Sequence, residues 1–172
     1  MKDVMDSVIE EIDNLESFED VLDMAIALEE KGRSFYLDKV SEIQNPAVKD
    51  LFKYLAGEEK KHAQYLKDFK EKNSEVGNIH DIADFKPVAS DAPDFKGMLD
   101  EEFSNNWMDE EGVLLSALRF EKKTENLYRE LAKRSTNDQR REFFEKLAEF
   151  EKGHYEIIDG FLEYATEFRM QT

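Results

Sequence analysis

Cysteine is absent from this sequence of 172 residues, and only 3 Pro, 7 Gly and 1 Trp occur in it. Without thiolates the sequence cannot form disulfides, iron–sulfur clusters, tetra-cysteine iron centres or thiolate zinc sites. Because Pro and Gly interrupt helices, their scarcity favours long helices over strands and turns. Hydrophobic residues make up 40% of the sequence. They suffice for a core, and the length suits one domain.

Positive charge is also in short supply, since 24 Lys and Arg stand against 41 Asp and Glu and give a net charge of −17. An acidic surface repels nucleic acid and anionic membranes, so we expect neither as a partner. No apolar run is long enough to span a bilayer, and the acidic N-terminal stretch does not have the pattern of a secretory signal. These features predict a cytoplasmic protein.

Four segments show the apolar periodicity of amphipathic helices. They cover about 17–43, 45 onward, about 109–134, and 137 towards the C-terminus. We expect the last helix to break near Gly160. Residues 73–108 hold two of the three prolines and fit a long crossover between the second and third helices. The predicted fold is therefore all-α, a four-helix bundle with two short connections and one long crossover.

Polar residues mark the expected helix starts. Ser17 is a predicted N-cap of the first helix, and Asn45 is a predicted N-cap of the second, with Pro46 at the first helical position. Residues 1–16 are expected to form a short amphipathic helix or extension, and residues 17–172 to form the bundle domain.

The two predicted helical hairpins match each other at an offset of 92 residues. When residues 25–66 are laid over 117–158 without gaps, eleven of the 42 positions are identical. Similar amphipathic helices readily share Leu or Lys, but they less readily share Glu, Tyr and His in one ungapped frame. The polar matches are Glu29 with Glu121, Tyr36 with Tyr128, Glu59 with Glu151, and His62 with His154.

Helical spacing predicts that these residues point into the bundle. Glu29 lies four residues after Ala25 and seven before Tyr36, so it shares their apolar face. Glu59 follows a core leucine by one turn, and His62 follows Glu59 by three residues. Since the second hairpin repeats this pattern, four carboxylates and two imidazoles are expected at similar depth.

Four buried carboxylates need compensation, because desolvation and mutual repulsion both disfavour their charges. No Lys or Arg lies on the inward stripes near the predicted site, so either some carboxylates stay protonated or cations compensate. Two divalent metals match the four negative charges, and carboxylates with imidazoles suit Fe(II) or Mn(II). A Glu from each of two helices with Glu-x-x-His from each of the other two is the ligand pattern of di-iron carboxylate bundles. Tyr36 and Tyr128 are either ordinary core tyrosines or hydrogen-bond donors to ligand carboxylates.

Four segments, ALEEKGRSFY, LAGEEKKHAQYL, ALRFEKKTENLYREL and LAEFEKGHYEII, together resemble the rubrerythrin branch of the ferritin-like superfamily. The resemblance covers roughly residues 17–165 and implies a ferritin-like bundle with two iron ions, or manganese in their place. It implies that Glu59 and Glu151 bridge the metals, whereas Glu29 and Glu121 are more terminal. The implied metal ligands are Glu29, Glu59, His62, Glu121, Glu151 and His154. The four glutamates would also serve catalysis, with Tyr36 and Tyr128 contacting the centre.

The sequence departs from rubrerythrins in two respects. Those proteins usually carry a rubredoxin domain with four cysteines, and this sequence has no Cys. They also carry an extra glutamate one turn after the ligand of the third helix. That position is Thr124 here, with Gly32 as its counterpart in the first repeat, and Glu125 lies one residue out of phase. Peroxide reduction by this chain would therefore need an external electron donor.

The resemblance implies redox activity toward peroxide or O2, as in a rubrerythrin-like oxidoreductase. The alternative is an iron-binding, ferroxidase or storage protein without multi-turnover peroxidase activity. A third class is a metal-free helical interaction module. Related bundles often form dimers, and residues 1–16 carry apolar side chains, so we expect a homodimer.

Overall fold

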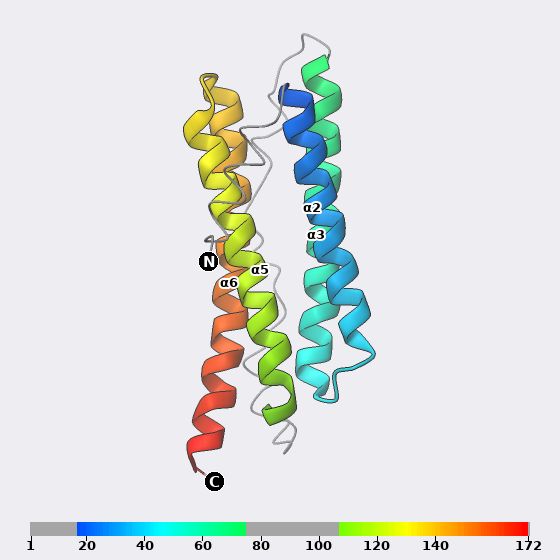
Figure 1. Cartoon of the computed structure of the whole chain (residues 1–172), viewed down its shortest axis with the longest axis vertical. Coiled ribbons are helices and arrows are strands. Elements are labelled where there is room, and N and C mark those ends of the chain that lie inside the picture. The colour runs from blue at the N-terminus through cyan, green and yellow to red at the C-terminus, as the bar shows by residue number, and fades with distance from the viewer. Residues whose placement is uncertain (1–16, 75–106, 172) are drawn as a thin grey trace, which may run out of the picture.

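The computed structural model describes residues 17–74 and 107–171, and all regular structure within these ranges is helical (Figure 1). The four helices are α2 (Phe18–Val40), α3 (Pro46–Ser74), α5 (Trp107–Arg134) and α6 (Asp138–Gln171). Helices α2 and α3 form one antiparallel hairpin, and α5 and α6 form a second hairpin beside it (Figure 1). The prediction of an all-α, ferritin-like four-helix bundle is confirmed.

Helix directions explain how the hairpins are connected. Helix α3 ends at one end of the bundle, whereas α5 begins at the other (Figure 1). A crossover connection requires this arrangement. The predicted crossover, 73–108, lies outside the described residues apart from its ends, which belong to α3 and α5. The predicted N-terminal helix or extension, 1–16, also lies outside them.

Polar side chains cap three of the helices at their predicted starts. Ser17 accepts a hydrogen bond on Oγ from the backbone amide three residues later, at 3.2 Å. Asn45 and Asn137 each accept two bonds on Oδ1, from the amides two and three residues later. These distances are 2.9 and 3.3 Å for Asn45, and 2.9 and 3.2 Å for Asn137. The caps satisfy amides that have no partner inside the helix.

Three helix boundaries differ from the predictions. Helix α2 ends at Val40, before the predicted Ile43, and Ile43 reaches the core from the connection. Helix α5 begins two residues earlier than predicted. Helix α6 does not break at Gly160. A helical glycine costs only about 1 kcal/mol relative to Ala, whereas burying Ile158 and Phe161 on either side of it stabilises the helix by roughly 1.5–3 kcal/mol each.

Two apolar clusters fill the bundle and leave a polar layer between them. One cluster includes Phe52 and Leu55. The other includes Phe69 and Phe143, whose rings stack with centroids 4.0 Å apart. On each of the four helices, residues of one cluster precede the predicted metal ligands and residues of the other cluster follow them. The candidate site therefore lies inside the bundle, with apolar packing above and below it.

Glu110 of α5 connects the second hairpin to the turn of the first. Its side chain is buried, and its Oε1 accepts hydrogen bonds from the backbone amides of Gln44 (2.6 Å) and Asn45 (3.1 Å). These amides precede α3 and would otherwise lack an acceptor in a region shielded from water. Asn45 is therefore held both by its own cap and by the opposite hairpin.

Asn45→Ala is expected to lower the free energy of unfolding by about 1–2 kcal/mol, because its cap is fully buried and two amides would lose their acceptor away from water. Asn137→Ala is the matched control, since it removes the same two bonds at an exposed position. Its loss should be about 0.5 kcal/mol. Urea unfolding of both variants measures the difference, and equal losses would contradict the role given to burial.

Candidate metal centre

The six predicted ligands converge in the polar layer between the two apolar clusters. Helix α2 supplies Glu29, and α5 supplies Glu121. Helices α3 and α6 supply the two Glu-x-x-His pairs, in which the Glu and His lie three residues apart and so face the same side of the helix. All six side chains are buried, with exposed fractions between 0 and 4%. The convergence follows from the apolar stripes, because each ligand occupies a core position of its helix.

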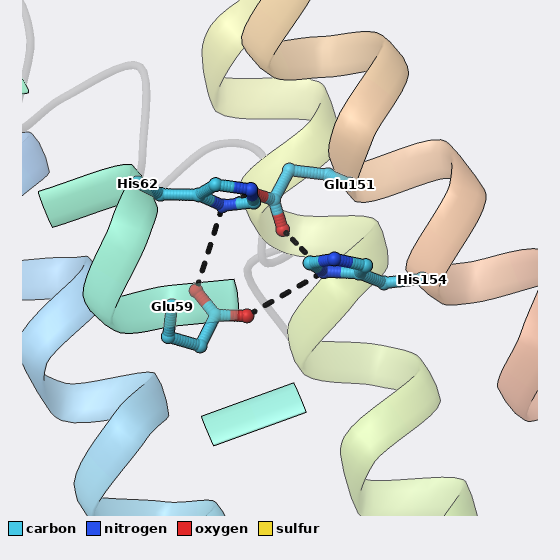
Figure 2. A group of neighbouring side chains, drawn as sticks. All are labelled: Glu59, His62, Glu151 and His154. Carbon is cyan, nitrogen blue, oxygen red and sulfur yellow. Dashed lines mark ion pairs between the residues drawn. The ribbon is translucent and has the colours of Figure 1, made fainter. Parts of the chain in front are cut away.

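Glu59 and Glu151 each direct one carboxylate oxygen towards each of the two imidazoles (Figure 2), whose rings stack with centroids 5.1 Å apart. Glu59 places Oε2 3.9 Å from Nδ1 of His62 and Oε1 3.6 Å from Nδ1 of His154. Glu151 places Oε1 2.8 Å from Nδ1 of His62 and Oε2 3.8 Å from Nδ1 of His154. Ligand atoms from these four residues all lie within 4.8 Å of one another. Each carboxylate thus offers one oxygen to each half of the site.

Glu29 and Glu121 occupy the outer positions, each beside one histidine. Glu29 Oε2 lies 3.5 Å from Nδ1 of His62, and Glu121 Oε2 lies 3.3 Å from Nδ1 of His154. The other oxygen of each carboxylate accepts a hydrogen bond from a tyrosine of the opposite hairpin. Tyr128 donates its hydroxyl to Glu29, and Tyr36 donates to Glu121. Both tyrosines are buried in the core and donate to carboxylates of the cluster.

Burial and repulsion act together on the two central carboxylates. Burial raises the pKa of Glu59 well above its usual range, and the charges of Glu151, Glu29 and Glu121 raise it further. Burial and the charges of Glu29 and Glu121 likewise raise the pKa of Glu151, although His154 partly opposes them. In the absence of a cation, these two groups therefore tend to retain protons.

The outer carboxylates shift in the opposite direction. Burial alone would raise the pKa of Glu29, but the favourable interactions with the adjacent Glu59, His62 and Tyr128 side chains outweigh it, so the pKa is lowered. The pKa of Glu121 is lowered despite its burial, mainly through His154. Burial and the neighbouring carboxylates raise the pKa of both tyrosines well above the ordinary value. Both hydroxyls therefore remain protonated and able to donate at neutral pH.

The polar atoms of this layer lack enough partners within the protein. Atoms without a hydrogen bond are both carboxylate oxygens of Glu59 and Glu151, Oε2 of Glu29 and Glu121, both nitrogens of His62, and Nδ1 of His154. Among the described residues, no Lys or Arg side chain is buried. Unpaired buried oxygens and nitrogens are costly unless a cation takes them as ligands. A pair of divalent ions would satisfy both the charge and the orphaned atoms.

A four-helix bundle with two carboxylate-imidazole pairs and two flanking glutamates has the residue arrangement of a class of helical bundles, the dinuclear carboxylate proteins. Within that class, the chain belongs to the rubrerythrin family, whose model matches residues 20–100 and 112–167. The family membership supports metal binding in this buried cluster.

A solved structure supports the fold alone. A hypothetical protein from Pyrococcus furiosus aligns with a TM-score of 0.64 and 23% sequence identity, over 89% of this chain and 92% of its own. No curated protein matches this chain. Within the described ranges, 17–74 and 107–171, no helix combines the length and apolarity needed to cross a membrane.

The position of the extra rubrerythrin glutamate carries no metal ligand. Thr124 is buried there, and its hydroxyl donates to the backbone oxygen of Phe120 at 2.9 Å. Glu125 does not substitute for it, since its carboxylate pairs with Lys122 (3.1 Å) and Arg129 (2.9 Å). These cations hold the pKa of Glu125 below its usual range, although burial of the side chain would raise it. The described site therefore contains four carboxylates and no fifth.

All eight residues predicted from the sequence lie in or directly beside this cluster. The sequence reasoning missed one neighbour, Phe120, whose ring packs against Gly32 next to Glu59. The sequence repeat does mark this position. At the offset of 92 residues, Phe120 corresponds to Leu28, and Thr124 corresponds to Gly32. The two halves thus differ at positions directly beside the predicted ligands.

Replacing both central carboxylates by amides, Glu59→Gln with Glu151→Gln, is expected to stabilise the metal-free protein increasingly as pH rises. The folded-state pKa values of both groups are raised above the ordinary 4.5. Their contribution to stability is therefore complete at acid pH and is lost as pH rises through the folded-state pKa.

Thermal unfolding with a chelator measures this effect between about pH 5 and about pH 8. The melting temperature of the wild type should fall relative to that of the double variant across this range. If the melting temperatures of the two proteins change with pH in parallel, the ionisation of these two carboxylates does not destabilise the metal-free protein.

Proposed function

We propose that this protein is a di-iron oxidoreductase that reduces peroxide or O2 with electrons from an external donor. The observation that carries the proposal is the burial of four carboxylates around two imidazoles, with no buried Lys or Arg among the described residues. Carboxylates and imidazoles without thiolates favour Fe(II) or Mn(II) over structural zinc. Bound iron would supply the redox chemistry by which the oxidant gains its electrons.

The side chains around the metal pair would have different binding roles. Glu59 and Glu151 would each offer one oxygen to either ion, since each faces both histidines. Glu29 and Glu121 would bind at the outer positions, where one oxygen remains free of hydrogen bonds. The tyrosine hydroxyls would fix the orientation of these outer carboxylates from the opposite hairpin. Apolar packing on both sides would exclude bulk water from the site.

The electron donor would be a separate molecule or protein. The 172 residues contain no Cys, so they hold no iron–sulfur or rubredoxin-type centre that could pass electrons to the site. Any sustained reduction of peroxide therefore depends on a supplied reductant. We expect this reaction in the cytoplasm and in a homodimer, as the sequence suggests.

The second candidate is an iron-binding, ferroxidase or storage protein that reacts once per site. The observation that favours it is the replacement of the extra rubrerythrin glutamate by Thr124, with Glu125 held in ion pairs outside the site. With four carboxylates, the centre has fewer ways to rearrange its ligands between oxidation states.

The double variant Glu59→Ala with Glu151→Ala is expected to lose dinuclear binding, because both carboxylates that face both histidines are removed. After anaerobic Fe(II) loading and desalting, mass spectrometry should find about two irons per wild-type chain and fewer than about one in the variant. Glu125→Ala is the control, since it removes a buried glutamate that faces away from the site.

The loading experiment separates three outcomes. Two irons retained by the double variant would refute the ligand assignment. Loss of iron from Glu125→Ala would show that loading responds to any buried glutamate. Poor loading of the wild type itself would favour a metal-free interaction module.

Steady-state peroxide reduction distinguishes the enzyme from the storage protein. With a supplied reductant and the iron-loaded protein, we expect peroxide consumption over many turnovers per site, because electrons can be replaced after each reaction. A single oxidation event per site, followed optically, would instead support the second candidate. The double variant, which lacks the metal pair, serves as the background control.

A further inference from the structure

Gly32 leaves a notch beside the metal centre, and the ring of Phe120 fills it. A Cβ built on Gly32 would lie 2.5 Å from Cε1 and 2.7 Å from Cζ of Phe120. The same Cβ would lie 3.5 Å from the carboxylate carbon of Glu59. The tip of the ring therefore occupies space that any other side chain at position 32 would take, next to a carboxylate that faces both histidines.

The ring of Phe120 extends from the surface to this notch. Phe120 is half-buried, whereas Gly32 and Glu59 are buried. The ring stacks on Phe35 with centroids 6.5 Å apart and an interplanar angle of 24°, and it meets Tyr36 edge-on at 6.5 Å. The half-exposed ring thus reaches inward as far as the position of Gly32, beside the buried Glu59 carboxylate.

The opposite half of the repeat is built differently at the same place. The residues that correspond to Gly32 and Phe120 are Thr124 and Leu28. One half combines the largest and smallest side chains of the four, and the other combines two of intermediate size. Only the first combination places a flat aromatic ring against a residue that has no side chain.

Packing alone does not require this combination. A glycine inside α2 costs about 1 kcal/mol relative to Ala, and the Leu and Thr of the other half show that the bundle accepts a filled position. Gly32 places no side chain against the ring, so Phe120 can swing about its side-chain torsions there. In the other half, the β-branched Thr124 fills the position that corresponds to Gly32. The notch therefore favours a movable side chain at this point.

We propose that Phe120 is a steric gate through which small molecules of two or three non-hydrogen atoms reach the dinuclear centre, with Gly32 as its seat. The inference deepens the proposed function and rests on it for the identity of the centre. Small molecules would thus enter on the side of the site that contains Gly32, and the side that contains Leu28 would remain closed to them. Phe120 acts by position and contacts no reacting atom.

Azide binding to the oxidised iron-loaded protein measures access directly. Phe120→Ala should raise the association rate on the order of tenfold, because removal of the ring eliminates the opening step. Gly32→Ala should also raise the association rate, although this substitution adds an atom. The new Cβ would overlap the ring of Phe120 and displace it from its position against residue 32. Leu28→Ala, the corresponding truncation on the other side, should change the rate by less than about twofold.

Two results would overturn the gate. The first is an unchanged azide rate in Phe120→Ala at normal iron content, and the second is an equal increase in Leu28→Ala. Iron content is measured beforehand, so absence of iron counts against the proposed function and not against the gate.

A crystal structure of metal-free Gly32→Ala tests the gate without any metal. The ring of Phe120 should leave the notch and open a water-filled path to Glu59. A ring that stays against residue 32 while α2 and α5 spread apart would show a fixed packing element, and the gate would be rejected.

Discussion

Four carboxylates buried inside the bundle are the constraint on which the rest of the structure depends. Without a positive partner, burial and repulsion force Glu59 and Glu151 towards the protonated state. The unfavourable electrostatic free energy is confined to one layer of the bundle, and aromatic and aliphatic side chains pack on both sides of that layer. Such a layer weakens the metal-free protein, so the cost is consistent with a site maintained for binding cations.

Sequence reasoning located the buried cluster of carboxylates and imidazoles because the duplicated hairpin repeats it. A single Glu-x-x-His in an acidic helix carries little information, but His62 and His154 in one frame, each with a partner glutamate, predict convergence. The bundle itself followed from caps and periodicity, and the capping roles of Ser17 and Asn45 are confirmed by their hydrogen bonds. These features depend on local geometry, which a sequence encodes directly.

Features that depend on contacts between helices could not be predicted from the sequence. Spacing placed Tyr36 and Tyr128 on inward faces, but it could not show that each bonds a carboxylate of the other hairpin. The continuity of α6 through Gly160 depends on neighbouring buried side chains that outweigh a local preference. The notch at Gly32 is visible only once Phe120 is placed against it. Each of these outcomes is decided by tertiary packing.

The crossed tyrosine bonds have a consequence for how the centre is assembled. Each hairpin brings two carboxylates and one imidazole, yet the hydroxyl that steadies its outer carboxylate belongs to the other hairpin. Neither half holds the complete cluster of carboxylates, imidazoles and hydroxyls. The cluster closes through side-chain complementarity between two similar halves, so it is complete only when the two hairpins dock.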